Sequence, residues 1–250
     1  MTDSDWLIQH SHGDGIVEIK LARAPVNALS AEFLMDFAKL IKDLGEDPAV
    51  CALLLTSPFK VFSAGLDLKV ARDFDDAGQR AAVQGLNEAF LALYACPKPV
   101  VTAVNGAAIA GGLFFVLCSD VRVAQVKSKF GLAEVQAGVD FPIAPLEIAR
   151  ATLNPNIQRR LMLTGQTIGP IAARNFNIVD IIADDAEDLL GYALKEARTL
   201  ADLPPKSFAA IKHQLRGETI AKIKAAMASE DSFQQWFTDE TVPAMTRVIG

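Results

Sequence analysis

The 250-residue sequence has few of the residue types that build disulfide frameworks and metal sites. Its three cysteines, Cys51, Cys96 and Cys118, match no disulfide or zinc-binding spacing. The three histidines are scattered, and none stands in a recognisable catalytic pattern with a cysteine. The sequence therefore predicts free thiols in a reducing compartment, no metal site and no metal or redox cofactor.

Basic residues are also in deficit, with 24 lysines and arginines against 30 aspartates and glutamates and a net charge of −6. Nucleic-acid binding needs a basic surface that neutralises phosphates, so no nucleic-acid partner is predicted. The acidic segment 1–6 lacks the apolar core of a signal peptide and the arginines of a transit peptide, which predicts a cytoplasmic protein.

Charge is absent from residues 99–119, a stretch as long as a membrane span. Asn105, several glycines and a strand-like first half are typical of a buried strand, turn and helix instead. No membrane association is predicted.

The order of the predicted elements indicates an α/β core at 1–183 and a helical region at 184–250. The predicted strands are 6–12, 16–21, 52–55, 99–104, 120–124 and 178–182. The predicted helices are 30–45, 80–94, 186–203, 205–216 and 219–238. Ser30 is a favoured N-cap for the first helix and Gly45 a favoured C-terminal residue. Residues 69–79 are predicted to form a polar loop.

Two glycine turns each follow a predicted strand, one at Phe62–Leu68 and one at Asn105–Gly112. The second turn leads into an apolar helix, and this arrangement leaves backbone N–H groups unpaired at the turn and the helix start. Two such groups that converge on one carbonyl oxygen form an oxyanion hole. The alternative is that these glycines only shape tight turns.

A single glutamate, Glu134, lies in the mostly apolar segment 130–138. Desolvation there raises the pKa of a carboxyl group and suits it to act as a general base. The alternative is a surface glutamate on a loop, but Phe130, Leu132 and Val135 favour partial burial.

These segments, together with Arg23–Ser30 (Arg-Ala-Pro-Val-Asn-Ala-Leu-Ser), occur in the order typical of one family. From about residue 16 to the C-terminal helices, the chain resembles the crotonase superfamily, also called the enoyl-CoA hydratase/isomerase family. The resemblance implies an α/β fold, the ClpP/crotonase-like spiral of ββα units with a C-terminal helical trimerisation region. It also implies an acyl-CoA thioester substrate, of which coenzyme A is a part, and a homotrimer or homohexamer.

The resemblance gives individual residues their roles. It makes Glu134 the catalytic residue, and the backbone N–H groups of Leu66 and Gly111 the oxyanion hole. The implied substrate and CoA contacts are Val26, Ala28, Ala64, Gly65, Asp67, Leu68 and Ala133. The implied acyl pocket consists of Phe114, Phe115, Asp140 and Phe141.

One position departs from the hydratases of the family, which carry a second glutamate three residues after the oxyanion-hole glycine. Here that position is Phe114, and a phenyl ring cannot orient water or exchange a proton. The chain therefore most resembles the Δ3,Δ2-enoyl-CoA isomerases, which use one glutamate. A hydratase with another second acid, such as Asp140, and a non-catalytic acyl-CoA-binding protein are the alternatives. Asp140 also has a structural explanation that competes with a catalytic role: it could be the N-cap of a helix that begins near Pro142.

The C-terminal helices carry apolar residues on more than one face. These residues include Phe208, Ile211, Leu215, Trp236 and Phe237. Exposed apolar patches mark interfaces, so this region is predicted to form the contact between subunits. The alternative is a monomer whose helices fold back over their own domain.

Overall fold

The computed structural model describes residues 5–229 and 235–250, and a six-stranded sheet organises them. In spatial order the strands are β1 (Leu7–Ser11), β2 (Ile16–Leu21), β4 (Ala52–Thr56), β6 (Val100–Val104), β8 (Val121–Gln125) and β10 (Ile181–Ala183). β1 is antiparallel to β2, and all other neighbours in this sheet are parallel. β4 and β6 are buried along their whole length, as expected of parallel strands covered on both faces.

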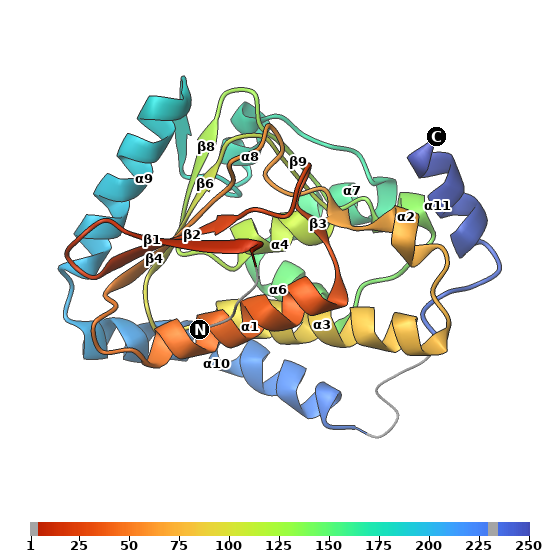
Figure 1. The fold of residues 1–250 in the computed structure, drawn as a ribbon, viewed down its shortest axis with the longest axis horizontal. Helices are drawn as coiled ribbons and strands as arrows, with labels where there is room; N and C mark the ends of the chain where they lie inside the picture. Colours follow the sequence, from red (N-terminus) through yellow and green to blue (C-terminus); the bar gives the residue numbers. More distant parts are fainter. Residues whose placement is uncertain (1–4, 230–234) are drawn as a thin grey trace.

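Helices cover both faces of this sheet. Since successive side chains of a strand point to opposite faces, Leu53 and Leu55 pack in one apolar cluster while Leu54 packs in another. The first face is covered by α1 (Ala31–Glu46) and α3 (Asp76–Ala95), which lie beside α10 (Pro205–Met227) beneath the sheet in Figure 1. The second face is covered by α9 (Ala186–Ala201).

Two small parallel sheets carry the glycine turns. β3 (Ala28–Leu29) pairs with β5 (Gly65–Leu66), and β7 (Ala107–Ile109) pairs with β9 (Lys129–Gly131). Short helices begin directly after three of these strands: α2 (Leu68–Ala71), α4 (Gly111–Leu117) and α5 (Glu134–Ala137). The remaining helices are α6 (Ile143–Thr152), α7 (Pro155–Thr164), α8 (Pro170–Asn175) and α11 (Thr241–Ile249).

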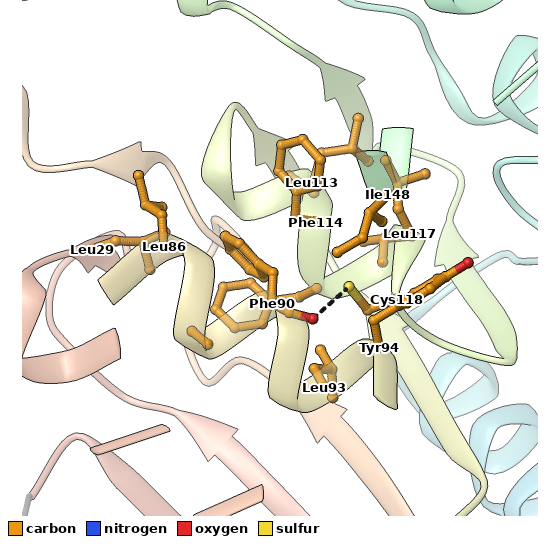
Figure 2. Close-up of a cluster of buried hydrophobic side chains, with 14 of the residues drawn as sticks. Leu29, Leu86, Phe90, Leu93, Tyr94, Leu113, Phe114, Leu117, Cys118 and Ile148 are labelled. Atoms are coloured by element: carbon orange, nitrogen blue, oxygen red, sulfur yellow. Dashed lines mark hydrogen bonds between the residues drawn. The ribbon is translucent and has the colours of Figure 1, made fainter. Parts of the chain in front are cut away.

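The contact between α3 and α4 forms an aromatic part of the core. Figure 2 shows Leu86, Phe90 and Leu93 of α3 beside Phe114 and Leu117 of α4. The ring centroids of Phe90 and Phe114 are 5.3 Å apart, within the range of favourable aromatic pairs. This packing fixes the helix that begins at the second glycine turn.

A buried ion-pair cluster fastens α10 to the core. Lys212 Nζ lies 2.6 Å from Asp120 Oδ2, and Arg216 Nη2 lies 2.8 Å from Asp120 Oδ1. Arg216 Nη1 also donates to the backbone carbonyls of Tyr94 and Cys118. The charges are thus paired and hydrogen-bonded, as buried charges must be.

Several predicted boundaries are confirmed and others are wrong. Ser30 caps α1 by accepting the N–H of Phe33, as predicted, but α1 continues through Gly45 to Glu46. The predicted loop 69–79 is wrong because α2 occupies its start and Asp75 caps α3 from residue 76. The predicted strand at 178–182 lies at Ile181–Ala183.

The C-terminal helices also differ from the prediction. Gly217 does not end a helix, because α10 runs through it between the anchors Lys212 and Arg216 and the buried Ile220 and Ile223. That burial outweighs the roughly 1 kcal/mol that glycine costs inside a helix. Of the predicted helix 219–238, residues 230–234 lie outside the described residues, and 235–238 are not helical.

The uncharged stretch 99–119 forms β6, β7 and α4 within the core, as predicted. No helix within residues 5–229 and 235–250 combines the length and the apolarity needed to cross a bilayer. A cytoplasmic location stays a prediction.

Candidate active site

The two glycine turns meet at the contact between β5 and α4. Gly65 has φ +80°, a conformation that favours glycine, and a Cβ built on it would lie 3.2 Å from the nitrogen of Gly111. A Cβ on Gly112 would lie 2.4 Å from the carbonyl oxygen of Ser63. Glycine at both positions therefore lets the two turns approach closely enough to act on one ligand atom.

Strand and helix geometry leaves the N–H groups of Leu66 and Gly111 without an acceptor in β3 and α4, respectively. Asp67 donates its N–H to the Leu29 carbonyl at 3.0 Å, so the preceding N–H of Leu66 points to the other side of β5, toward α4. Gly111 is the first residue of α4, and the first N–H groups of a helix have no partner within it. The structure thus brings the two predicted donors together at one end of a helix dipole.

Buried side chains hold the first turn in place. Asn27, which is fully buried, donates from Nδ2 to the Phe62 carbonyl at 2.8 Å and to the Ser57 hydroxyl at 2.9 Å. The hydroxyl of Ser63 in turn donates to the Asn27 carbonyl at 2.7 Å. The sequence analysis missed the roles of Asn27 and Ser63, although Ser63 lies within the first turn and Asn27 within the segment Arg23–Ser30.

Glu134 is the first residue of α5 and its side chain is buried, with 9% exposure of the residue. Its Oε2 atom is buried and has no hydrogen-bond partner within the described residues. Burial raises the pKa of this carboxyl group from its ordinary 4.5 to about 8, against a smaller opposing effect of its own backbone N–H. The predicted burial is therefore confirmed, and the role of Glu134 as a general base stays a prediction.

Glu134 and the two turns border one cavity of about 110 Å³. Its lining residues are apolar except for Glu134, among the residues that the structure describes. They are Ala64, Leu66, Leu68, Leu86, Ile109, Ala110, Gly111, Phe114, Ala133, Glu134, Ala137, Val139, Pro142, Pro145, Trp236 and Val248. A carboxylate, two directed N–H groups and an apolar wall are the parts needed to form and hold an enolate.

The four predicted acyl-pocket residues have different positions. Phe114 lines the cavity and is 1% exposed. Phe115 does not line it: its ring is turned by about 100° around α4 from that of Phe114 and packs against Phe37, with the ring centroids 5.0 Å apart. Phe141 lies behind Phe114, with ring centroids 6.4 Å apart. Of the two phenylalanines predicted on this helix, the structure thus places Phe114 at the cavity and Phe115 in the core beside it.

Asp140 is exposed and does not line the cavity. Burial of part of its side chain raises its pKa, while a hydrogen bond from Trp236 lowers it. The N-cap explanation was wrong: α6 follows Pro142 without a side-chain cap at that position, and Asn87 accepts the Ala144 N–H at 2.9 Å. The role of Asn87 was missed because it lies on α3, far away in the sequence.

The remaining predicted contact residues fall into two groups. Ala64, Leu68 and Ala133 line the cavity. Those that do not line it are Val26, Ala28, Gly65 and Asp67. Asp67 instead pairs with Arg23, whose Nη1 lies 3.2 Å from Asp67 Oδ2 and also donates to the Ala28 carbonyl. These residues fasten β3 to β5, and a contact between them and coenzyme A stays a prediction.

Comparison with known proteins gives the family of the chain. The chain matches the enoyl-CoA hydratase/isomerase family over residues 11–245, and it belongs to that family. It is 32% identical over 211 residues to a Thermus thermophilus protein named as an enoyl-CoA hydratase, with 83% of this chain and 80% of that protein covered. Acyl-CoA thioesters are the substrates of this family.

Two further relatives show how varied the reactions are. The chain is 29% identical over 221 residues to the Mycobacterium tuberculosis (7aS)-7a-methyl-1,5-dioxo-2,3,5,6,7,7a-hexahydro-1H-indene-carboxyl-CoA hydrolase, covering 88% of this chain and 87% of that protein. It matches the crystal structure of human mitochondrial Δ3-Δ2-enoyl-CoA isomerase with a TM-score of 0.84 and 25% identity, covering 98% and 96% of the two chains. The α/β fold is crotonase-like, and the residues of the site must distinguish the reactions.

Proposed function

We propose that the protein catalyses the Δ3-to-Δ2 isomerisation of enoyl-CoA thioesters. The observation that carries this proposal is a single carboxylate, Glu134, in an otherwise apolar cavity beside two backbone donors. Isomerisation requires one base that removes a proton from C2 and returns it at C4. It requires no water and no second acid, and the composition of the cavity supports that requirement.

The geometry suggests the role of each group. The thioester oxygen accepts hydrogen bonds from the N–H groups of Leu66 and Gly111, which stabilise the negative charge that develops when C2 loses its proton. Glu134 takes that proton and delivers it to C4, while the double bond moves from C3–C4 to C2–C3. The carboxylate is then regenerated for the next turnover.

The raised pKa of Glu134, about 8, supports this role. An unpaired carboxylate in an apolar cavity is a stronger base than one in water, because its charge is not stabilised by solvent. At pH 7 the ionised form that starts the reaction is present in about one molecule in ten of the free enzyme.

Hydration, the reaction in the name of the Thermus relative, requires a group that positions a water molecule. Phe114 lines the cavity in place of the second glutamate of the hydratases, and the exposed Asp140 lies outside the cavity. These two positions favour isomerisation over hydration at this site.

The test compares two substrates and two variants. In the first assay, purified protein is given a 3-enoyl-CoA, and the appearance of the conjugated 2-enoyl thioester is followed by its absorbance. In the second assay, the protein is given crotonyl-CoA, and the loss of the same absorbance is followed. Glu134→Gln is expected to lower the isomerisation rate by about a hundredfold or more, with acyl-CoA binding retained. Asp140→Asn is the control and is expected to keep the wild-type rate.

Two results would contradict the proposal. One is wild-type turnover in Glu134→Gln. The other is rapid consumption of crotonyl-CoA that Asp140→Asn abolishes, which would instead support a hydratase with Asp140 as its second acid.

We also propose that α10 mediates assembly into a trimer or a dimer of trimers. Ile211 is 56% exposed and Leu215 is 80% exposed on this helix, and closed symmetry would bury both in every subunit. Trp236 and Phe237 do not belong to this surface, contrary to the sequence-based expectation, because both are buried in their own chain. Light scattering at low micromolar concentration checks the proposal, and the mass of a single chain would refute it.

A further inference from the structure

The cavity beside Glu134 is small and almost wholly apolar, and its size limits the acyl group. We propose, on the basis of the isomerase activity proposed above, that the site selects four-carbon acyl groups and that Phe114 and Trp236 set this limit. The preferred substrate is then a 3-butenoyl thioester, and the product is the corresponding 2-butenoyl thioester.

The volume of the cavity is the first argument. The cavity borders Leu66, Gly111 and Glu134, so the reacting carbons from C1 to C4 must lie inside it. A closed apolar cavity of about 150 Å³ holds a benzene molecule with its six carbons. The 110 Å³ found here therefore accommodates about four carbons, and the reacting part of the substrate already fills it.

Phe114 forms a buried wall of the cavity. It is 1% exposed, and its ring packs against Phe90 at 5.3 Å and Phe141 at 6.4 Å between centroids. Figure 2 shows the Phe114 side chain among Leu113, Phe90 and other buried core residues. Since protein cores are close-packed, this ring cannot yield to a longer acyl chain without displacing its neighbours.

Trp236 forms a side wall and comes from the C-terminal segment. It is 8% exposed, and its Nε1–H donates to the Asp140 carbonyl at 3.1 Å. The adjacent N–H of Phe237 donates to Gln79 Oε1 at 3.1 Å. These bonds tie the segment to α3 and to the chain between α5 and α6, so the indole ring is also a fixed boundary.

The neighbouring residue provides a matched control. Phe114 and Phe115 lie on the same helix and are equally buried, at 1% and 0% exposure, but only Phe114 lines the cavity. Phe114→Val and Phe115→Val each remove the same atoms from the core. Only the first variant enlarges the cavity. A change in substrate preference that occurs in Phe114→Val alone is therefore an effect of the cavity wall, whereas a change in both variants is an effect of a loosened core.

The experiment measures kcat/KM for 3-enoyl-CoAs with four, six and eight carbons. In the wild type, the value is expected to fall at least about tenfold from four to eight carbons. In Phe114→Val the ratio of eight-carbon to four-carbon kcat/KM is expected to rise at least about tenfold, and in Phe115→Val it is expected to stay at the wild-type value. If Phe114→Val does not fold, Trp236→Ala is expected to raise the same ratio.

Wild-type enzyme that uses the eight-carbon substrate as well as the four-carbon one would overturn the length limit and leave the isomerase activity standing. An equal shift of the ratio in Phe114→Val and Phe115→Val would overturn the assignment of the wall. Calorimetry with four-carbon and eight-carbon acyl-CoAs that contain no double bond tests the length limit separately from the isomerase reaction. The same preference in binding, without isomerisation of any substrate, would refute the proposed reaction and support the length limit.

Discussion

Replacing Glu134 by glutamine is expected to stabilise the folded chain at alkaline pH, although it removes the proposed base. Burial raises the pKa of Glu134 from 4.5 to about 8, so the folded state holds this proton more tightly than the unfolded state. The stabilising contribution of the protonated carboxyl is fully present below pH 4.5 and is lost as the pH rises to about 8. Glutamine is neutral at every pH and avoids this loss.

The magnitude follows from the two pKa values. Each pH unit between them corresponds to about 1.4 kcal/mol, so ionisation of the buried carboxyl costs about 5 kcal/mol of folding free energy above pH 8. Most of that cost arises between pH 5 and pH 9. The stability of Glu134→Gln relative to the wild type is therefore expected to rise by about 4 kcal/mol over this interval.

Urea unfolding at a fixed protein concentration, at pH 5, 7 and 9, measures this difference. Glu147→Gln is the control. Burial raises the pKa of Glu147, but hydrogen bonds and ion pairs with Lys222 and Arg150 together outweigh burial and lower it below 4.5, so Glu147 is already ionised at pH 5 and the stability difference between this variant and the wild type is expected to stay constant from pH 5 to pH 9. A constant difference between Glu134→Gln and the wild type from pH 5 to pH 9 would refute the buried, unpaired carboxylate.

Three further predictions concern the strained turn, the anchor of α10 and the pH–rate profile. Ala110 has φ 51° and ψ −127°, so Ala110→Gly is expected to raise the free energy of unfolding by about 1 kcal/mol, and an unchanged urea midpoint would exclude strain there. Lys212→Met removes one of the two cations paired with Asp120 and is expected to lower that free energy by about 1.5–3 kcal/mol; a loss below about 1 kcal/mol would show that Arg216 alone suffices. Isomerisation kcat/KM is expected to rise with pH until about pH 8, as Glu134 ionises, and a flat profile from pH 6 to pH 9 would contradict its role.

Local sequence signals predicted the parts of the fold that depend on local physics. The buried strands at β4 and β6 were evident from apolar runs, and the Ser30 cap from its side-chain chemistry. The proximity of Leu66 and Gly111 followed from the family resemblance. The structure gives its physical basis: the absence of a side chain at Gly65 and Gly112 lets the two turns pack closely together. The helix breaks failed where tertiary contacts outweighed propensity, as at Gly45 and Gly217.

The supports of the site could not be predicted because they join distant parts of the chain. Asn87 caps α6 across 57 residues of sequence, and Lys212 reaches Asp120 across 92. An asparagine on one helix and a lysine on another carry no local sign of these partners. Trp236 was assigned to the subunit surface for the same reason, since an apolar residue near a C-terminus suits an interface as well as a cavity wall.

The position of Trp236 connects the stability of the site with its selectivity. The cavity is apolar enough to raise the pKa of Glu134 only while water is excluded, and Trp236 and Phe114 are two of the residues that exclude it. A wall that admits a longer acyl group therefore also admits water to the free enzyme. In Trp236→Ala, broader chain-length use is expected to accompany a lower pKa in the pH–rate profile, because both depend on the same closed volume. A profile that keeps its midpoint near pH 8 while the chain-length preference broadens would show that the two properties are independent.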